Sequence, residues 1–286
     1  MATFQNQAAI TWGGTTRLSN ITTGQIVDVV NANKTPVVET YATGDTLTYV
    51  VNINNTGDSA LSGLTVTDDL GAYEAGDPAQ TLTPLTYVED SLLYFINGVP
   101  QPTPTVTADP ALTVTDISVP AEGTATLVYQ AAANEFAPLG CDGEIVNTAT
   151  VSGEGLCEDV VTDATVSAIC GVDLSILKSV SPETVTCGER VTYSFLIEND
   201  GGEAADAETG AVVSDSFDPI LSDVVVTLGG VTLTEGTGYT YDEATGEFAT
   251  IPGVLTVPAA TYEQDPATGA WTTIPGTVTL TVAGNI

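Results

Sequence analysis

The sequence has no histidine and few basic residues. It contains 37 acidic side chains against four basic ones, and its formal net charge is -33. Binding to nucleic acid, or to an anionic membrane through a polybasic patch, requires a basic surface. Both modes of binding are therefore excluded. Without histidine, neither a Ser-His-Asp triad nor a histidine-based zinc site can form.

Long apolar runs and closely spaced cysteine pairs are also missing. No stretch is long enough to span a membrane, and the opening MATFQNQAAITW has neither the basic nor the apolar region of a secretory signal. The four cysteines form no CxxC pair, which argues against zinc and favours disulfides in an oxidising compartment. The acidic clusters lack the spacing of a calcium loop. We expect no metal and no cofactor.

The residues that are abundant suit β-strands. Threonine, valine, glycine and alanine dominate, and apolar and polar positions alternate along much of the chain. The segment TLTYVVNIN places four apolar side chains on one face, and VTYSFLIEN does the same. Short strands separated by Gly, Pro and Asp clusters predict an all-β protein made of Ig-like β-sandwiches.

An internal repeat divides the chain. Residues 34–57 align without gaps with residues 178–201, and each copy continues to a strand ending in an acidic motif and then to a late strand. The first copy goes on to a closing hairpin, EIVNTATVSGEG and VVTDATVSAI, whereas the second ends at VTLTVAGNI. We therefore expect two tandem Ig-like domains, at 25–170 and 171–286, the second lacking its last two strands.

The N-terminal segment resembles the closing hairpin that the second domain lacks. FQNQAAITWGG aligns with IVNTATVSGEG, which matches Asn6 to Asn147. Residues 1–24 are therefore predicted to be a donor hairpin that completes the second domain of a neighbouring copy, in a head-to-tail contact. The alternative is that the hairpin folds back onto the second domain of its own chain. The residues expected to enter the acceptor domain are Phe4, Ala8, Ile10 and Trp12.

Period-two alternation directs three kinds of polar residue inward in each domain. Lys34 and Lys178 occupy the same repeat position, each on the apolar face of its strand. The same parity directs Asp68 and Asn147 inward in the first domain. It also directs Asp215 inward in the second domain, and the asparagine expected to join it is Asn6 of the N-terminal hairpin. A buried unpaired lysine is very costly, so each set must be brought together.

The pattern K-T…GDTLTYVVNINNTG…VTDDL…VNTATV resembles the conserved repeat of bacterial and archaeal surface proteins known as domain of unknown function eleven. The resemblance covers nearly the whole chain in two copies, but not the variable middle of each. It implies Ig-like domains in tandem and a structural or adhesive role at the surface. Short members without a signal resemble proteins of spore surfaces and appendages in Gram-positive bacteria.

The inward Lys, Asp and Asn sets resemble the Lys-Asn isopeptide sites of collagen-adhesin-type pilin domains. Such a site would join Lys34 to Asn147 within the first domain, assisted by Asp68. In the second domain Lys178 would meet Asn6 of the next subunit, assisted by Asp215. The alternative is a buried Lys-Asp ion pair with asparagine beside it and no covalent chemistry.

Topology also suggests how the cysteines pair. Cys141 precedes one strand and Cys170 ends the next, both at the end of the first domain that faces the second, so we predict a disulfide between them. Cys157 is expected at the start of the first domain and Cys187 at the far end of the second. They would meet only across a joint between subunits, where we predict a disulfide between them. The alternative is four buried free thiols.

The sequence therefore predicts the structural subunit of an extracellular filament, on a cell or spore surface, whose partner is another copy of itself. A monomeric surface adhesin, or a module that binds carbohydrate or calcium, is the alternative. Enzymatic activity is expected to go no further than single-turnover isopeptide formation.

Overall fold

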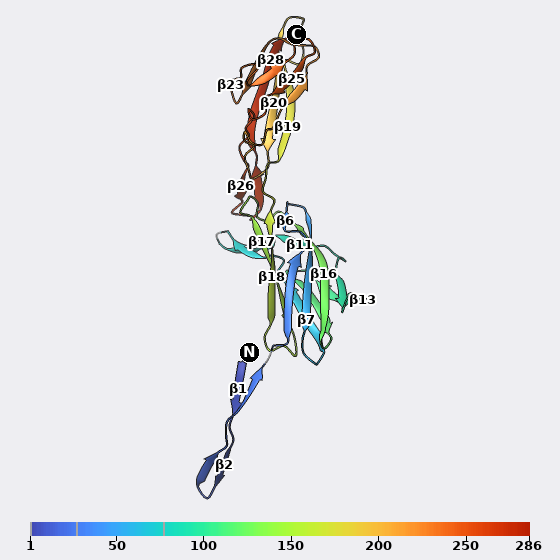
Figure 1. Ribbon diagram of the computed structural model, residues 1–286, viewed down its shortest axis with the longest axis vertical. Helices are drawn as coiled ribbons and strands as arrows, with labels where there is room; N and C mark the ends of the chain where they lie inside the picture. Colours follow the sequence, from blue (N-terminus) through green and yellow to red (C-terminus); the bar gives the residue numbers. More distant parts are fainter. Residues whose placement is uncertain (1, 27, 77) are drawn as a thin grey trace.

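The computed structural model describes residues 2–26, 28–76 and 78–286, and all regular elements in this part of the chain are β-strands. A narrow N-terminal hairpin and two β-sandwiches follow one another along a single long axis, with the C-terminus at the far end of the second sandwich (Figure 1). The predicted all-β sandwich class is confirmed. The described residues include no helix capable of crossing a membrane.

The N-terminal hairpin stands away from both sandwiches (Figure 1). Its outer strands pair with each other, as do its inner strands, and Gly13 and Gly14 make the turn with φ of 50° and 84°. Its large apolar side chains are exposed, Phe4 by 55% and Ile10 by 65%. The hairpin extends two residues beyond the predicted limit of 24, and its strands are β1 (Ala2–Asn6), β2 (Ala9–Trp12), β3 (Thr15–Leu18) and β4 (Thr22–Ile26).

The first sandwich has two large sheets. One has the order β13-β12-β16-β7-β5 with β11 also on β16, and the other has the order β14-β15-β8-β17-β18-β6. Alternating residues of both sheets bury a continuous apolar core. The strands are β5 (Val30–Pro36), β6 (Thr40–Tyr41), β7 (Thr46–Asn55), β8 (Leu61–Asp68), β9 (Tyr73–Ala75), β10 (Gln80–Leu82), β11 (Leu85–Tyr87), β12 (Leu93–Ile96), β13 (Val99–Gln101), β14 (Thr105–Thr107), β15 (Leu112–Val119), β16 (Gly123–Ala133), β17 (Glu144–Ser152) and β18 (Val160–Ala168).

The second sandwich is smaller. Its main sheet has the order β19-β20-β28-β22-β23, and β21-β25-β24 faces it across a separate core. The strands are β19 (Leu174–Ser181), β20 (Arg190–Asn199), β21 (Ser214–Ser216), β22 (Ser222–Leu228), β23 (Val231–Thr232), β24 (Tyr239–Tyr241), β25 (Glu247–Thr250), β26 (Thr261–Gln264), β27 (Trp271–Ile274) and β28 (Gly276–Asn285).

The two sandwiches repeat each other where their sequences align. β7 lies between β5 and β16, and β20 lies between β19 and β28 in the same way. The buried amides of Asn55 and Asn199, which occupy the same repeat position, each donate to two loop carbonyls of their own domain. The repeat in the sequence is therefore a repeat of backbone pairing and of loop anchoring.

The sandwiches differ at one sheet edge. In the first domain β8 pairs with β15 on one side and β17 on the other. In the second domain β21, which carries Asp215, pairs with β25 alone among the described strands. No described strand occupies the place of β17 beside it, so the backbone groups along this edge remain available for another strand.

The β26–β27 hairpin of the second domain contacts the first domain through hydrogen bonds. The Trp271 indole and the Gln264 side chain both donate to the Tyr73 hydroxyl, at 3.2 and 3.0 Å, and the Trp271 backbone N–H donates to the Glu135 carbonyl. Tyr73 and Glu135 belong to the first domain. These contacts join the two domains, which lie in line in Figure 1.

Candidate crosslinking sites and docking edge

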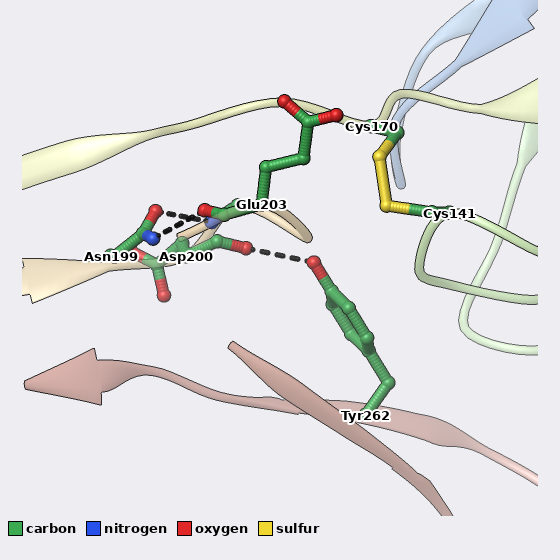
Figure 2. The surroundings of a disulfide bond; sticks show 7 residues. Cys141, Cys170, Asn199, Asp200, Glu203 and Tyr262 are labelled. Carbon is green, nitrogen blue, oxygen red and sulfur yellow. Dashed lines mark hydrogen bonds between the residues drawn. A yellow bond between two sulfur atoms is a disulfide. The ribbon is translucent and has the colours of Figure 1, made fainter. Parts of the chain in front are cut away.

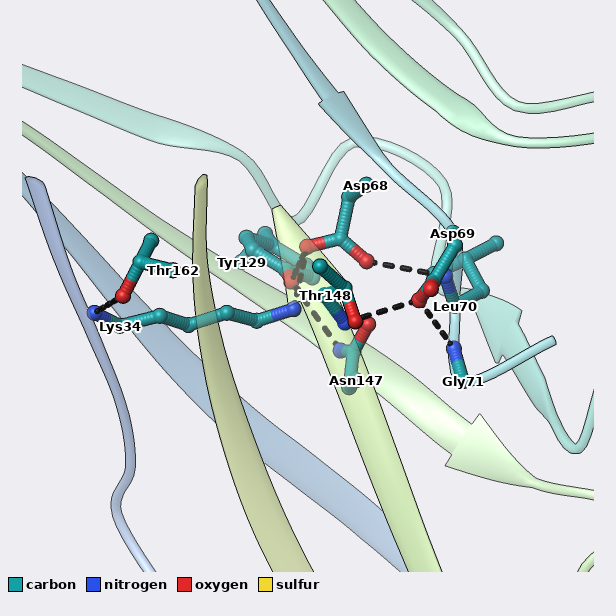
Figure 3. Close-up of polar contacts among 9 residues, drawn as sticks. All are labelled: Lys34, Asp68, Asp69, Leu70, Gly71, Tyr129, Asn147, Thr148 and Thr162. Carbon is teal, nitrogen blue, oxygen red and sulfur yellow. Dashed lines mark hydrogen bonds and ion pairs between the residues drawn. The ribbon is translucent and has the colours of Figure 1, made fainter. Parts of the chain in front are cut away.

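A lysine, an aspartate and an asparagine meet in the core of the first domain. Lys34 lies on β5, Asp68 ends β8 and Asn147 lies on β17, and all three are at most 3% exposed. The Lys34 Nζ lies 2.6 Å from Asp68 Oδ2. In Figure 3 the lysine side chain extends between the sheets with its amine directed at Asp68 and Asn147. The structure therefore brings the three residues singled out in the sequence together in this domain.

Burial controls the electrostatics of this site. Desolvation lowers the pKa of Lys34, although the neighbouring Asp68 carboxylate opposes the shift. The Lys34 Nζ also lies 5.1 Å from the centre of the Tyr49 ring, whose face attracts a cation. The amine is therefore held charged mainly by one carboxylate, and loss of its proton to that carboxylate would leave two neutral groups in an apolar core.

The structure adds a fourth member, Tyr129 on β16, which the sequence prediction missed. Its hydroxyl donates to Asp68 Oδ2 and accepts a hydrogen bond from Asn147 Nδ2 at 3.4 Å. Burial, and then the charge of Asp68, raise the pKa of Tyr129. Asn147 Oδ1 is buried and makes no hydrogen bond with the described residues. The alternation of apolar and polar residues in GTATLVYQ places Tyr129 on the buried face of its strand. That alternation was the signal from which the sequence could have identified it.

This arrangement contains the groups needed for amide transfer. Lys34 supplies an amine, Asn147 supplies a carboxamide carbon, and Asp68 can hold a proton between them. The second oxygen of Asp68 accepts the Leu70 backbone N–H at 3.0 Å, which fixes the carboxyl plane. The ion pair itself is also a complete structural element without any reaction.

Replacing Asp68 by asparagine is expected to destabilise the first domain strongly. The Lys34 ammonium would lose its counter-ion in a site where it is 3% exposed, a change that typically costs about 3–5 kcal/mol. Denaturant unfolding followed by tyrosine fluorescence measures the effect. Asp163→Asn is the control because Asp163 lies exposed on β18 of the same domain. Equal stability of the two variants would contradict the prediction.

The corresponding site in the second domain is half open. Lys178 contacts Asp215, but the two side chains are 43% and 17% exposed. The Lys178 Nζ lies 4.9–5.5 Å from the ring centres of Tyr193, Phe195 and Phe217. The sequence analysis placed Lys178 on the inward face of a domain that lacks its last two strands. In the single chain Lys178 stays partly exposed, because no described strand covers it as β17 covers Lys34.

The uncovered region is apolar as well as open. Apart from half-buried Leu174, every residue of β19 is exposed, including Ile176 at 55% and Val180 at 37%. Beside β21 a hollow is lined by Asp215, Tyr241 and Phe248, among other residues. An exposed sheet edge with apolar surface beside it is typical of a site where another strand docks.

The expected donor residues are not near this edge in their own chain. Asn6 and the rest of the hairpin project from the opposite end of the molecule to the second domain (Figure 1). Phe4, Ile10 and Trp12 are 52–65% exposed there, and Ala8 is exposed too. The alternative in which the hairpin folds back onto its own second domain is not the arrangement of this structure, so Asn6 and Lys178 stay apart within one chain.

The cysteines fall into two classes. Cys141 and Cys170 form a disulfide with a Cα–Cα distance of 4.8 Å, as the topology predicted. Figure 2 shows this disulfide beside the turn from Asn199 to Glu203 of the second domain. A Cβ added at Gly202 would lie 2.7 Å from the Cys141 Sγ, so the turn packs closely on the disulfide. The bond therefore stabilises the junction between domains.

Removing this disulfide with paired Cys141→Ser and Cys170→Ser changes is expected to cost about 3–4 kcal/mol, since it closes a loop of 29 residues. Thermal unfolding under oxidising conditions measures the loss. Changing both Cys157 and Cys187 to serine is the matched control, because their side chains are exposed. A loss of the same size in the control would contradict the prediction.

Cys157 and Cys187 remain unpaired within the described residues and are exposed. Cys157 lies in the turn between β17 and β18, where it lines a hollow with Asp28 and Val30 at the start of the first domain. Cys187 lies in the turn between β19 and β20, next to the Gly188 N–H that donates to the Ile286 carbonyl. The two thiols therefore occupy opposite ends of the pair of sandwiches.

The described residues contain no cluster of three or more His, Cys, Asp or Glu side chains that could hold a metal ion. The acidic side chains of Glu203 and Asp206 lie in an exposed turn of the second domain, where Asp206 accepts backbone N–H groups of its own loop. These hydrogen bonds lower the pKa of Asp206.

Comparison with known proteins finds only distant likeness. No family model and no curated protein matches the chain. Among solved structures, the major pilin subunit of Bacillus cereus is 13% identical, with 95% of this chain and 73% of that chain covered and a TM-score of 0.37. A fragment of the major pilin of Streptococcus agalactiae is 13% identical, with 87% of this chain and 91% of that chain covered and a TM-score of 0.35.

A collagen-binding domain from a Staphylococcus aureus adhesin is 15% identical, with 50% of this chain and 99% of that chain covered and a TM-score of 0.31. Likeness at this level assigns neither a family nor a function. The functional argument therefore rests on the contacts and open edges of the chain itself.

Proposed function

We propose that this chain is the structural subunit of an extracellular filament on a cell or spore surface. Each subunit inserts its N-terminal hairpin into the second domain of the next copy. One observation carries the proposal: an exposed apolar hairpin at one end of the molecule matches, in sequence, the strands that have no counterpart beside β21 in the second domain. Each feature is unfavourable alone, and both defects are removed by pairing them.

The pairing of β17 with β8 in the first domain predicts the register in which the donor strand would dock beside β21. Ala149 of β17 lies opposite Asp68 of β8, and the match of Asn6 to Asn147 places Ala8 opposite Asp215. Phe4 and Ile10 then take the places of Ile145 and Val151, which are at most 1% exposed. The apolar face of the donor strand, which is exposed in the single chain, would thereby be buried in the core of the acceptor domain.

The symmetry of this contact supports a filament. The donor and the acceptor are different surfaces of one chain, so an open assembly of any length leaves one hairpin unused at one end and one acceptor edge unused at the other. The two surfaces lie toward opposite ends of an elongated molecule (Figure 1). Such a head-to-tail contact propagates as a linear polymer unless it closes into a ring.

Covalent bonds would reinforce the polymer. Within the first domain, Lys34 would join Asn147 with loss of ammonia. At each joint, docking would bring Asn6 against the Lys178 and Asp215 pair and bury the amine among its three aromatic rings. Burial lowers the pKa of a lysine and so favours the neutral, nucleophilic amine. The crosslink at the joint would then form only after docking.

A second covalent link would use the two exposed thiols. In a head-to-tail polymer the Cys187 end of one subunit adjoins the Cys157 end of the next. Oxidation by a disulfide or by molecular oxygen would join them. Non-reducing gels of assembled material test this link, and Cys187→Ser should remove it without dissolving the polymer.

Negative-stain microscopy and light scattering of the whole chain test the proposal. We expect filaments, and we expect monomers when residues 1–24 are deleted. Supplying the deleted chain with a synthetic peptide of residues 1–26 should raise its unfolding temperature, since the peptide completes the second domain. A monomeric full-length chain, equal in size and stability to the deletion variant, would refute the filament.

A further inference from the structure

The two candidate crosslinking sites differ at one core position, where the first domain has a tyrosine and the second has a valine. Tyr129 pairs across the sheet with Tyr49, and Val282 pairs in the same way with Tyr193. Tyr49 and Tyr193 occupy the same repeat position, so Val282 stands where the first domain has Tyr129. Val282 is fully buried and carries no polar group. Among the described contacts, no tyrosine hydroxyl reaches Asp215.

Tyr129 touches the atom that must leave. Its oxygen accepts a hydrogen bond from Asn147 Nδ2 at 3.4 Å while its own proton is donated to Asp68 Oδ2. The same Asp68 oxygen lies 2.6 Å from the Lys34 Nζ. A continuous chain of hydrogen bonds therefore runs from the attacking amine, through the carboxyl and the phenol, to the amide nitrogen.

We propose that Tyr129 is a catalytic residue of the first-domain crosslink, which relays a proton from Asp68 to the departing nitrogen of Asn147. This inference rests on the crosslink in the proposed function. The joint between subunits would run without such a relay, with Asp215 alone serving the nitrogen of Asn6.

The step balances as an amide exchange without oxidation or reduction. The Lys34 ammonium gives one proton to Asp68, and the neutral amine attacks Asn147 Cγ to form a new N–C bond. The lysine nitrogen then loses a second proton, while the Cγ–Nδ2 bond of Asn147 breaks and ammonia leaves. One proton reaches Nδ2 through the Tyr129 hydroxyl, and the other remains on Asp68.

The hydroxyl is needed because of where the leaving nitrogen lies. An amide nitrogen must be protonated before it can leave, and water is excluded from a site in which Asn147 is fully buried. The Lys34 amine cannot serve as the acid while it is the nucleophile. Tyr129 is the hydrogen-bond partner that the described residues offer to Nδ2.

The test follows newly made chains in a cell-free translation mixture over time. Formation of the bond removes about 17 Da as ammonia. It also protects the denatured chain from trypsin at Lys34, because trypsin cuts beside a lysine only when its amine is free. With four basic residues in the chain, the fragments that report cutting at Lys34 are few and distinct. Both readouts apply to the full-length protein.

The informative pair of variants is Tyr129→Phe and Tyr49→Phe. The two rings stack at 5.7 Å in one core. The buried Tyr49 hydroxyl lies near Asn147 but makes no hydrogen bond of normal geometry with the described residues, Asp68 included, so it cannot relay a proton from that carboxyl. We expect Tyr129→Phe to slow the first-domain crosslink by about 100-fold, a typical loss for a missing proton-transfer group. Tyr49→Phe should react at nearly the normal rate.

Thermal unfolding of the purified Tyr129→Phe chain checks that its first domain has folded. A second replacement, 3,5-difluorotyrosine at position 129, keeps the ring and hydroxyl but lowers the phenol pKa, and a relay requires that it change the rate. Equal rates for Tyr129→Phe and the unaltered chain, or equal slowing by both phenylalanine variants, would overturn the relay alone. An unaltered chain that never loses ammonia would refute the crosslink itself.

Discussion

Replacing Ile10 by aspartate is expected to stop polymerisation and leave a folded monomer. In the proposed joint Ile10 takes the place of Val151, which is fully buried in the first domain. An unpaired carboxylate in that position costs at least about 3 kcal/mol, which weakens each joint by about 100-fold or more. In the single chain Ile10 is 65% exposed, so the change should leave both sandwiches intact.

The control for this variant is Thr11→Asp. Thr11 adjoins Ile10 on β2, is exposed as well, and aligns with half-buried Ser152 on the opposite face of the strand. It adds the same charge to the same hairpin. Light scattering and microscopy at matched concentrations should give filaments for Thr11→Asp and monomers for Ile10→Asp. If both variants polymerise, the predicted face of the donor strand is incorrect.

Replacing Asn6 by alanine is expected to give filaments that dissolve in boiling detergent with a reductant, which also opens any disulfide at the joint, whereas the unaltered filaments resist the same treatment. Alanine keeps the small size and the strand pairing but removes the carboxamide carbon that Lys178 would attack. The change affects the covalent bond more than docking, because most of the apolar contact is made by Phe4, Ile10 and Trp12. Denaturing gels of assembled material measure the outcome.

Three further variants define the site of the bond. Lys178→Arg should behave like Asn6→Ala, because a guanidinium stays protonated and is no nucleophile. Gln5→Ala changes the opposite face of β1 and should leave the filaments resistant. Lys34→Arg should also leave them resistant, since it affects only the first domain. Resistant ladders from Asn6→Ala would show that another bond holds the joint.

The sequence predicted the first-domain site because strand parity is a local property. Once residues 30–36, 61–68 and 144–152 are strands, period-two alternation decides which side chains face inward. Burial of Lys34 then required Asp68 nearby, because an isolated ammonium is not tolerated in a core. The disulfide between Cys141 and Cys170 followed from the same topology.

The sequence could not reveal the part played by Tyr129. Parity placed its ring in the core, but only the register of β16 on β7 sets its hydroxyl between Asp68 and Asn147. The register of β28 on β20 is likewise needed to see that Val282 of the second domain stands at the position of Tyr129. The late strands of the two copies fall outside their gapless alignment, so the sequence does not match these two residues.

By itself, the sequence determined the class of fold, the two domains and the inward lysine of each, because alternation and repetition are written in residue order. Only the tertiary structure decided which of those lysines is enclosed. Lys34 is buried by β17 and β18 of its own domain, whereas Lys178 is left 43% exposed beside β21, whose outer edge pairs with no described strand. The difference arises because closing a sandwich depends on strands distant in sequence, and their presence cannot be judged from the strand that carries the lysine.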